Sequence, residues 1–149
     1  IDFLEEILKK CNEKGINTAV DTAGAVPWKY FERVIPYTDI FLYDVKCLSD
    51  DLHIKGTGIS NNLILQNLKK LSDSILSDNY KGDIIIRIPV IGGFNDNIQE
   101  MNKIADFLKD IKYKCVELLP YHRIGEHKYE ALNMGYTTFS VPEKEYMDI

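Results

Sequence analysis

The sequence Ile84-Ile-Ile-Arg-Ile-Pro-Val-Ile91 is the strongest candidate strand of the chain, and Gly92-Gly93 follow it at once. A short, nearly continuous apolar run that is rich in β-branched residues and ends in glycines predicts a buried strand. Strands buried on both faces belong to parallel sheets that are covered by helices. This stretch therefore favours an α/β fold.

The rest of the chain repeats this pattern of strand and helix. Shorter apolar runs predict strands at residues 18–20, 40–43 and 115–119. Apolar side chains recur at helical spacing in the segments 3–11, 27–35, 65–76 and 101–111. The alternation predicts a parallel sheet with alternating helices in a single domain over residues 1–149. Four strands cannot close a barrel, so part of a barrel and an open doubly wound sheet both fit the pattern.

Polar residues at element boundaries refine these expectations. Asn61 or Asn62 is expected to cap the third helix, and the turn after Gly93 is expected to let the fourth helix start near Asp96. The first residue, Ile1, lies within a helical pattern, and Pro142 is placed to open another helix. We therefore expect the sequence to be a piece of a longer protein.

The composition excludes two classes of partner. Eighteen basic residues against 23 acidic ones give a net charge of −5, which argues against binding to a nucleic-acid backbone. No apolar run approaches the roughly 20 residues that span a bilayer. The sequence contains 3 cysteines, far apart and without metal-binding spacing, which is typical of reduced thiols. A cytoplasmic location is expected.

Ionisable residues stand at or near the end of every predicted strand. Ligands of parallel α/β folds bind at this carboxyl edge of the sheet. The strand ends read Asp21-Thr22, Asp44-Val45-Lys46, Arg87-Ile88-Pro89 and Tyr121-His122. Four such ends in one register predict a functional site there, although strand ends are also where solvent begins.

The individual residues at these strand ends each allow more than one role. Asp44 and Lys46 are two positions apart, so an extended backbone points both the same way, where they can hold a zwitterion or pair with each other. Lys46 is also a conceivable Schiff-base nucleophile. Arg87 interrupts an apolar strand and must find a carboxylate, from a ligand or from Asp21 or Asp44. His122 alone is a weak signal, and so are His53 and His127 in polar stretches.

Six short motifs follow one another along the chain: Asp21-Thr-Ala-Gly24, Leu42-Tyr-Asp-Val-Lys46, His53-Ile-Lys-Gly-Thr-Gly58 with Ser60-Asn61, Arg87-Ile-Pro-Val-Ile-Gly-Gly93, Glu117-Leu-Leu-Pro-Tyr-His122 and Gly125-Glu-His-Lys-Tyr129. In order and spacing they resemble the glycyl-radical-enzyme activating enzymes, whose best-known member activates pyruvate formate-lyase. These proteins belong to the radical S-adenosylmethionine superfamily. The resemblance implies that the chain forms the last four βα units of a partial (β/α)₆ TIM-like barrel.

The resemblance also implies roles for individual residues. It assigns contacts with S-adenosylmethionine to Thr22, Asp44, Val45, Lys46 and His122. It assigns a monovalent cation to Asp21, Thr22 and Asp44. It places Arg87 at the floor of the site, where the glycyl peptide enters. Carboxylates suit a hard cation, and a lysine suits the carboxylate of a zwitterion.

The implied activity is that of an oxidoreductase of the [formate-C-acetyltransferase]-activating type. The parent protein would use the 5′-deoxyadenosyl radical, formed from S-adenosylmethionine, to take a hydrogen atom from a glycine. Its partners would be a glycyl radical enzyme such as pyruvate formate-lyase and an electron donor such as flavodoxin or ferredoxin.

Two features of the family are missing from this sequence. They are the Cys-x-x-x-Cys-x-x-Cys loop that ligates a 4Fe-4S cluster and the Gly-Gly-Glu segment that receives the methionyl amino group. Cys11, Cys47 and Cys115 do not replace that loop, because cluster ligands gather on one short loop. We therefore expect the chain to be inactive on its own.

Three further expectations remain open at this point. Half of an aldolase-type barrel that uses Lys46, and a docking module without catalysis, are alternative functions. Self-association is also expected, because the strand at residues 18–20 would leave an open edge. The inner face would then expose apolar side chains, including Val20, Phe41, Ile86 and Ile88 if alternation places them inward. A monomer of marginal stability is the alternative to self-association.

Overall fold

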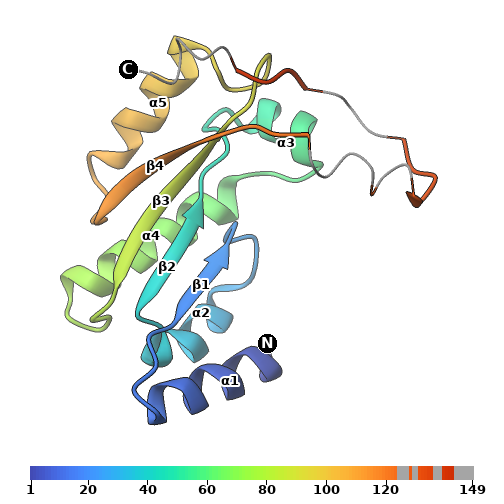
Figure 1. Ribbon diagram of the computed structural model, residues 1–149. Helices are drawn as coiled ribbons and strands as arrows, with labels where there is room; N and C mark the ends of the chain where they lie inside the picture. The colour runs from blue at the N-terminus through green and yellow to red at the C-terminus, as the bar shows by residue number, and fades with distance from the viewer. Residues whose placement is uncertain (124–127, 129–130, 136–138, 143–149) are drawn as a thin grey trace.

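The structure, a computed structural model, describes residues 1–123, 128, 131–135 and 139–142. Within this part of the chain, the strands form one parallel sheet in the order β1 (Ala19–Thr22), β2 (Ile40–Asp44), β3 (Asp83–Val90) and β4 (Cys115–Pro120). The helices are α1 (Asp2–Glu13), α2 (Trp28–Val34), α3 (Asp50–Thr57), α4 (Asn62–Leu76) and α5 (Ile98–Leu108), with a 3₁₀ turn, η1, at Ile35–Tyr37. A helix lies between each pair of successive strands, which confirms the α/β class (Figure 1).

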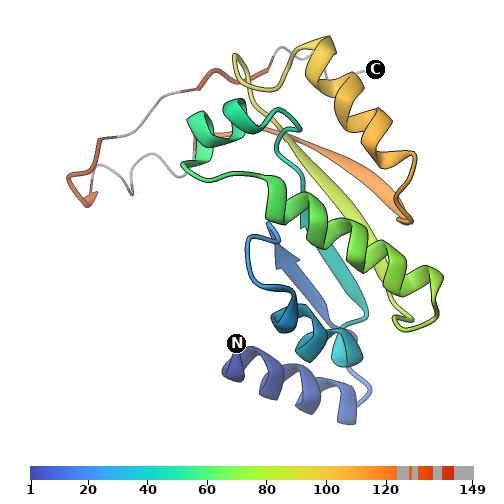
Figure 2. The same ribbon diagram turned by 180° about the vertical axis from the view of Figure 1, so that it is seen from behind.

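The helices that pack on the sheet cover only one of its faces. In the two opposite views, α2 and α4 lie behind the sheet in Figure 1 and in front of it in Figure 2, and α1 lies beyond the lower end of β1. Helix α5 packs on the same side, because Ile104 and Leu108 share an apolar cavity wall with Ile88 of β3. A doubly wound sheet carries helices on both faces. The one-sided arrangement therefore favours the barrel segment.

Alternation along the strands sorts their side chains between the two faces. In β3 the residues alternate strictly between intermediate exposure and burial. The buried set packs with α2, α4 and α5 in the core, whose innermost members include Phe41, Tyr43, Leu68, Leu71, Ile84, Ile86 and Ile104. The opposite face of the sheet carries Asp21, Asp44 and Arg87.

The expectation that four apolar side chains would be uncovered is wrong. Val20, Phe41, Ile86 and Ile88 are only 0–9% exposed. They belong to the helix-covered face, because alternation places them opposite Asp21, Asp44 and Arg87. The edge of β1 has no partner strand among the described residues, but the apolar face that was expected to drive self-association lies under the helices.

Local structure differs from expectation at three places. Residues 50–57, which were not predicted to be helical, form α3; its one buried side chain is His53, so no apolar periodicity marks it. Strand β1 runs from Ala19 to Thr22, two residues beyond the strand expected at residues 18–20. Helix α5 begins at Ile98, where the side chain of Asn97 accepts a hydrogen bond from the Glu100 amide.

None of the helices in the described part of the chain has the length and apolar character needed to cross a lipid bilayer.

Candidate functional site

Charged side chains from three neighbouring strands meet on the open face of the sheet. The Arg87 guanidinium donates from Nη2 to Asp21 Oδ1 at 2.8 Å and to Asp44 Oδ1 at 3.0 Å, and Nε lies 3.1 Å from the same Asp44 oxygen. Lys46 Nζ reaches the other oxygen of Asp44, Oδ2, at 3.3 Å. Asp44 and Arg87 are direct register partners of β2 and β3, which explains this convergence. We call Asp21, Asp44, Lys46 and Arg87 the charged network.

The network is balanced in charge and partly shielded from water. The side chains of Arg87, Asp44 and Lys46 are 20%, 21% and 29% exposed, whereas Asp21 is 59% exposed. Burial opposes the charge of Arg87, but the two carboxylates outweigh it and raise the pKa of the guanidinium. Asp44 is the centre of the network, since one of its oxygens pairs with Arg87 and the other with Lys46. Both cations thus point toward one carboxylate at the carboxyl edge of the sheet.

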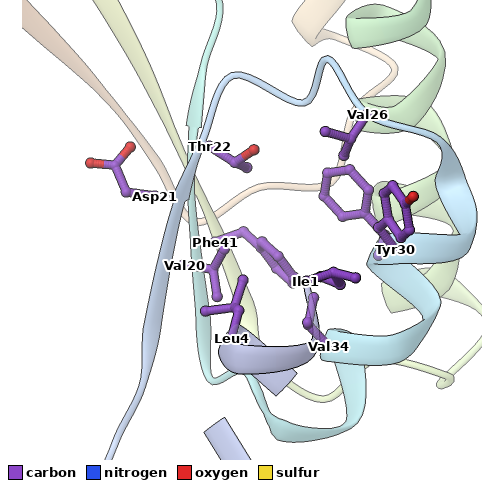
Figure 3. A pocket seen from close by; sticks show the side chains of 10 residues that line it. Ile1, Leu4, Val20, Asp21, Thr22, Val26, Tyr30, Val34 and Phe41 are labelled. Carbon is purple, nitrogen blue, oxygen red and sulfur yellow. The ribbon is translucent and has the colours of Figure 1, made fainter. Parts of the chain in front are cut away.

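The predicted site residues next to this network lie elsewhere. The Val45 side chain is 1% exposed in the core, while its amide donates to the Arg87 carbonyl at 2.9 Å. Thr22 accepts a hydrogen bond from the Gly24 amide at 3.0 Å. Figure 3 shows the side chains of Asp21 and Thr22 on opposite sides of β1. The positive charge between Asp21 and Asp44 is the Arg87 guanidinium, so the monovalent cation site stays a prediction.

Neither His53 nor His122 is part of the charged network. His122 is exposed and follows β4, and no hydrogen bond joins it to Asp44, Lys46 or Arg87 in the described part of the chain. His53 is 2% exposed, and its Nδ1 lies 2.7 Å from the Ile59 carbonyl oxygen, which indicates a structural role. His127 and the rest of the motif 125–129, except Lys128, lie outside the described residues.

The cysteines do not form a cluster site. Cys11 lies on α1, Cys47 follows the carboxyl end of β2, and Cys115 begins β4 at the opposite edge of the sheet. Burial, together with the charge of Glu100, raises the pKa of the Cys47 thiol to about 12. Across the described residues, no group of three or more His, Cys, Asp or Glu side chains is placed to hold a metal ion. The side chains described here therefore do not fit an iron–sulfur cluster.

A cavity beside β1 was not anticipated from the sequence. It has a volume of about 370 Å³ and is lined mainly by apolar side chains of α1, α2, β1 and β2, among them Leu4, Val20, Tyr30 and Phe41 (Figure 3). Thr22 faces this cavity, whereas the Asp21 carboxylate points away from it. The cavity and the charged network therefore lie on opposite sides of the sheet.

Glu100, like the cavity, was not singled out from the sequence. It is 3% exposed on α5, yet it reaches the loop after Lys46, where Oε1 accepts from the amides of Leu48 and Ser49 and Oε2 accepts from the Ser49 hydroxyl. Burial disfavours its charged form, but these hydrogen bonds and the Lys103 ammonium outweigh burial and lower the pKa of Glu100. A glutamate within an amphipathic helix gives no sequence signal of this role.

A parallel sheet with helices on one face, and with charged side chains at the carboxyl ends of its strands, is the arrangement found in a segment of a (β/α) barrel. No protein-family model matches the chain. Over 91% of its length it is 44% identical to the trans-4-hydroxy-L-proline dehydratase activating enzyme of Clostridioides difficile, and the match covers 44% of that protein. It is 36% identical to the indoleacetate decarboxylase activating enzyme of Tractidigestivibacter scatoligenes, again over 91% of this chain and over 41% of the relative.

A solved structure agrees with these relatives. A domain of the pyruvate-formate lyase-activating enzyme from Bacteroides vulgatus superposes with a TM-score of 0.78 at 26% identity, covering 99% of this chain and 80% of that one. The chain belongs to the glycyl-radical-enzyme activating enzymes, as the motifs indicated. It spans less than half the length of the curated relatives that it matches.

Proposed function

We propose that the charged network forms part of the S-adenosylmethionine pocket of a protein that generates a glycyl radical on a partner enzyme. The observation that carries this proposal is the placement of Lys46 and Arg87 around Asp44 at the carboxyl strand ends. Such a network offers a cation to a carboxylate and a carboxylate to an ammonium group, which suits the methionyl part of the cofactor. Family membership supports the same reading.

Different residues of the chain would bind different groups of the ligand. Lys46 would turn from Asp44 toward the ligand carboxylate, since their 3.3 Å contact is the longest in the network. Arg87 would keep Asp44 oriented by its two bonds, leaving the second oxygen of Asp44 for the ligand ammonium. The remaining proposed contacts are made by His122 and by the backbones of Thr22 and Val45, because the side chains of Thr22 and Val45 lie on the other side of the sheet. When bound, S-adenosylmethionine supplies the chemistry that removes a hydrogen atom from a glycine.

The wider setting is part of the same proposal. The partner would be a glycyl radical enzyme, either of the pyruvate formate-lyase kind or of the dehydratase and decarboxylase kinds named for the relatives. A 4Fe-4S cluster and an electron donor such as flavodoxin or ferredoxin would be needed, and the described cysteines do not supply the cluster ligands. We expect a cytoplasmic protein in which this chain alone is inactive.

The test is cofactor binding in a longer protein that contains this chain. Lys46→Ala or Asp44→Ala should weaken S-adenosylmethionine binding by about 1–3 kcal/mol, or about 5- to 150-fold, as expected for a charge-assisted contact. Lys81→Ala is the matched control, because Lys81 also pairs with an aspartate, Asp78, but the two side chains are 77% and 79% exposed. Calorimetry measures the affinities.

Two results would contradict the proposal. Unchanged affinity in both Lys46→Ala and Asp44→Ala would make the network a structural ion pair. Trapping of a carbonyl compound on Lys46 by borohydride would instead support the Schiff-base alternative.

A further inference from the structure

Three buried asparagines hold the loops at the carboxyl edge of the sheet. Asn61, Asn67 and Asn95 are at most 1% exposed, and the side-chain amide of each donates two hydrogen bonds to backbone carbonyls. Asn67 bonds the carbonyls of Gly24 and Val26 in the loop after β1, at 2.8 and 2.7 Å. A carbonyl in an irregular loop has no ladder partner, so a buried amide is the group that satisfies it. We call these three residues the asparagine clamps.

Asn95 differs from the other clamps because it joins the loop after β2 to strand β3. Its Nδ2 donates to the Lys46 carbonyl at 2.6 Å and to the Pro89 carbonyl at 2.7 Å. Its Oδ1 accepts from the Ile91 amide at 2.7 Å. One fully buried side chain therefore fixes the backbone of Lys46 relative to the strand that carries Arg87.

The loop beyond Lys46 is held in the same manner. Asn61 donates to the carbonyls of Cys47 and Leu48, both at 3.0 Å. Glu100 accepts from the amides of Leu48 and Ser49. Each of the four residues from Lys46 to Ser49 thus has at least one backbone group bonded to a buried side chain. These bonds come from elements distant in sequence, which fixes the loop although it lies in no helix or strand.

We propose that Asn95 is a positioning residue for Lys46, which rests on the proposed function. The Lys46 side chain is long and rotatable, so its ammonium reaches the ligand position only if its backbone is held in place. Asn95 holds that backbone against the end of β3, and this arrangement lets Lys46 and Arg87 face Asp44 together. A purely structural asparagine would affect cofactor binding in the same way whether or not Lys46 is present.

The experiment is a double-mutant cycle on the longer protein, with S-adenosylmethionine affinity as the readout. Asn95→Ala should weaken binding about tenfold in the native background but less than about twofold when Lys46 is already alanine. Asn95→Ser, which keeps one donor, should give an intermediate loss and serves if the alanine variant does not fold. Asn67→Ser is the matched control, because it removes an equally buried clamp whose effect should be the same in both backgrounds.

Amide hydrogen exchange on the 149-residue chain separates this inference from the proposed function. Asn95→Ser should speed exchange at the amides of Ile91, Leu48 and Ser49, while the β1–β2 ladder stays protected. Equal losses of affinity in both Lys46 backgrounds, or faster exchange throughout the chain, would overturn the positioning role. If the protein does not bind S-adenosylmethionine but shows the local exchange pattern, the proposed function is refuted, whereas the role of Asn95 in holding the backbone of Lys46 is supported.

Discussion

Replacing Arg87 by methionine should destabilise the chain by about 2–3 kcal/mol, because it leaves the Asp44 carboxylate without its stronger partner. The two bonds to Asp44 join side chains that are only 20% and 21% exposed, so they contribute about 1.5–3 kcal/mol, the range for hydrogen bonds to charged groups. The bond to Asp21 adds about 0–1 kcal/mol, since that carboxylate is 59% exposed. Methionine keeps the apolar contacts of the arginine stem, so no loss of packing is added to these two contributions. The expected total loss of stability is therefore about 2–3 kcal/mol.

Urea denaturation of the native and variant chains, followed by far-ultraviolet circular dichroism, measures this difference. Asp21→Asn is the control and should cost no more than about 1 kcal/mol, because it removes only the exposed arm of the network. Added salt should narrow the gap between Asp21→Asn and the native chain, since exposed charges are screened. A loss of stability below about 0.5 kcal/mol for Arg87→Met, which is the smallest contribution typical of a single hydrogen bond, would refute the claim that the bonds from Arg87 to Asp44 stabilise the chain more than the bond to Asp21. So would an equal loss for Asp21→Asn.

Three further predictions address the loops and the thiols. Gly24→Ala should cost about 2–4 kcal/mol in urea denaturation, because residue 24 has a φ of +73° and an added Cβ would overlap the buried Tyr43 hydroxyl. Glu100→Gln should lower the unfolding free energy above pH 4.5, which is the ordinary pKa of a glutamate. The difference between the variant and the native chain should vanish as the pH falls through the lowered pKa of folded Glu100. A difference that does not change with pH would contradict this prediction. Iodoacetamide, followed by mass spectrometry, should modify the exposed Cys115 in the native chain but Cys47 only after unfolding, and rapid labelling of Cys47 would disprove its burial.

The spacing of apolar residues predicted the strands and the amphipathic helices, because the buried face of each element consists of apolar side chains. The strand at residues 40–43 and the one beginning at Cys115 lie where the apolar runs placed them. The face of each strand was not predictable in the same way. In a nearly continuous apolar run such as residues 84–91, both alternating sets look equally fit for the core, and only Arg87 marks the open face.

Polar residues misled the sequence reading for the opposite reason. Asn61 and Asn95 stand in short polar stretches, where asparagine is typical of caps and turns. Asn61 stands at the cap position of α4, but its side chain makes no capping bond; it reaches back to the loop after β2 instead. A hydrogen bond to a residue 14 or 49 positions away, as in these two clamps, leaves no local pattern. The charged strand ends were found because topology alone brings them together.

The asparagine clamps also bear on the entropy of ligand binding. Fixing the backbone of one residue costs about 1–2 kcal/mol in conformational entropy, so ordering a four-residue loop costs about 4–8 kcal/mol. Since buried side chains already hold residues 46–49, that cost falls on folding and not on the arrival of a ligand. A small charged molecule that meets this loop would therefore lose none of its contact energy to ordering the backbone of residues 46–49, and its complex would form with little change in that backbone.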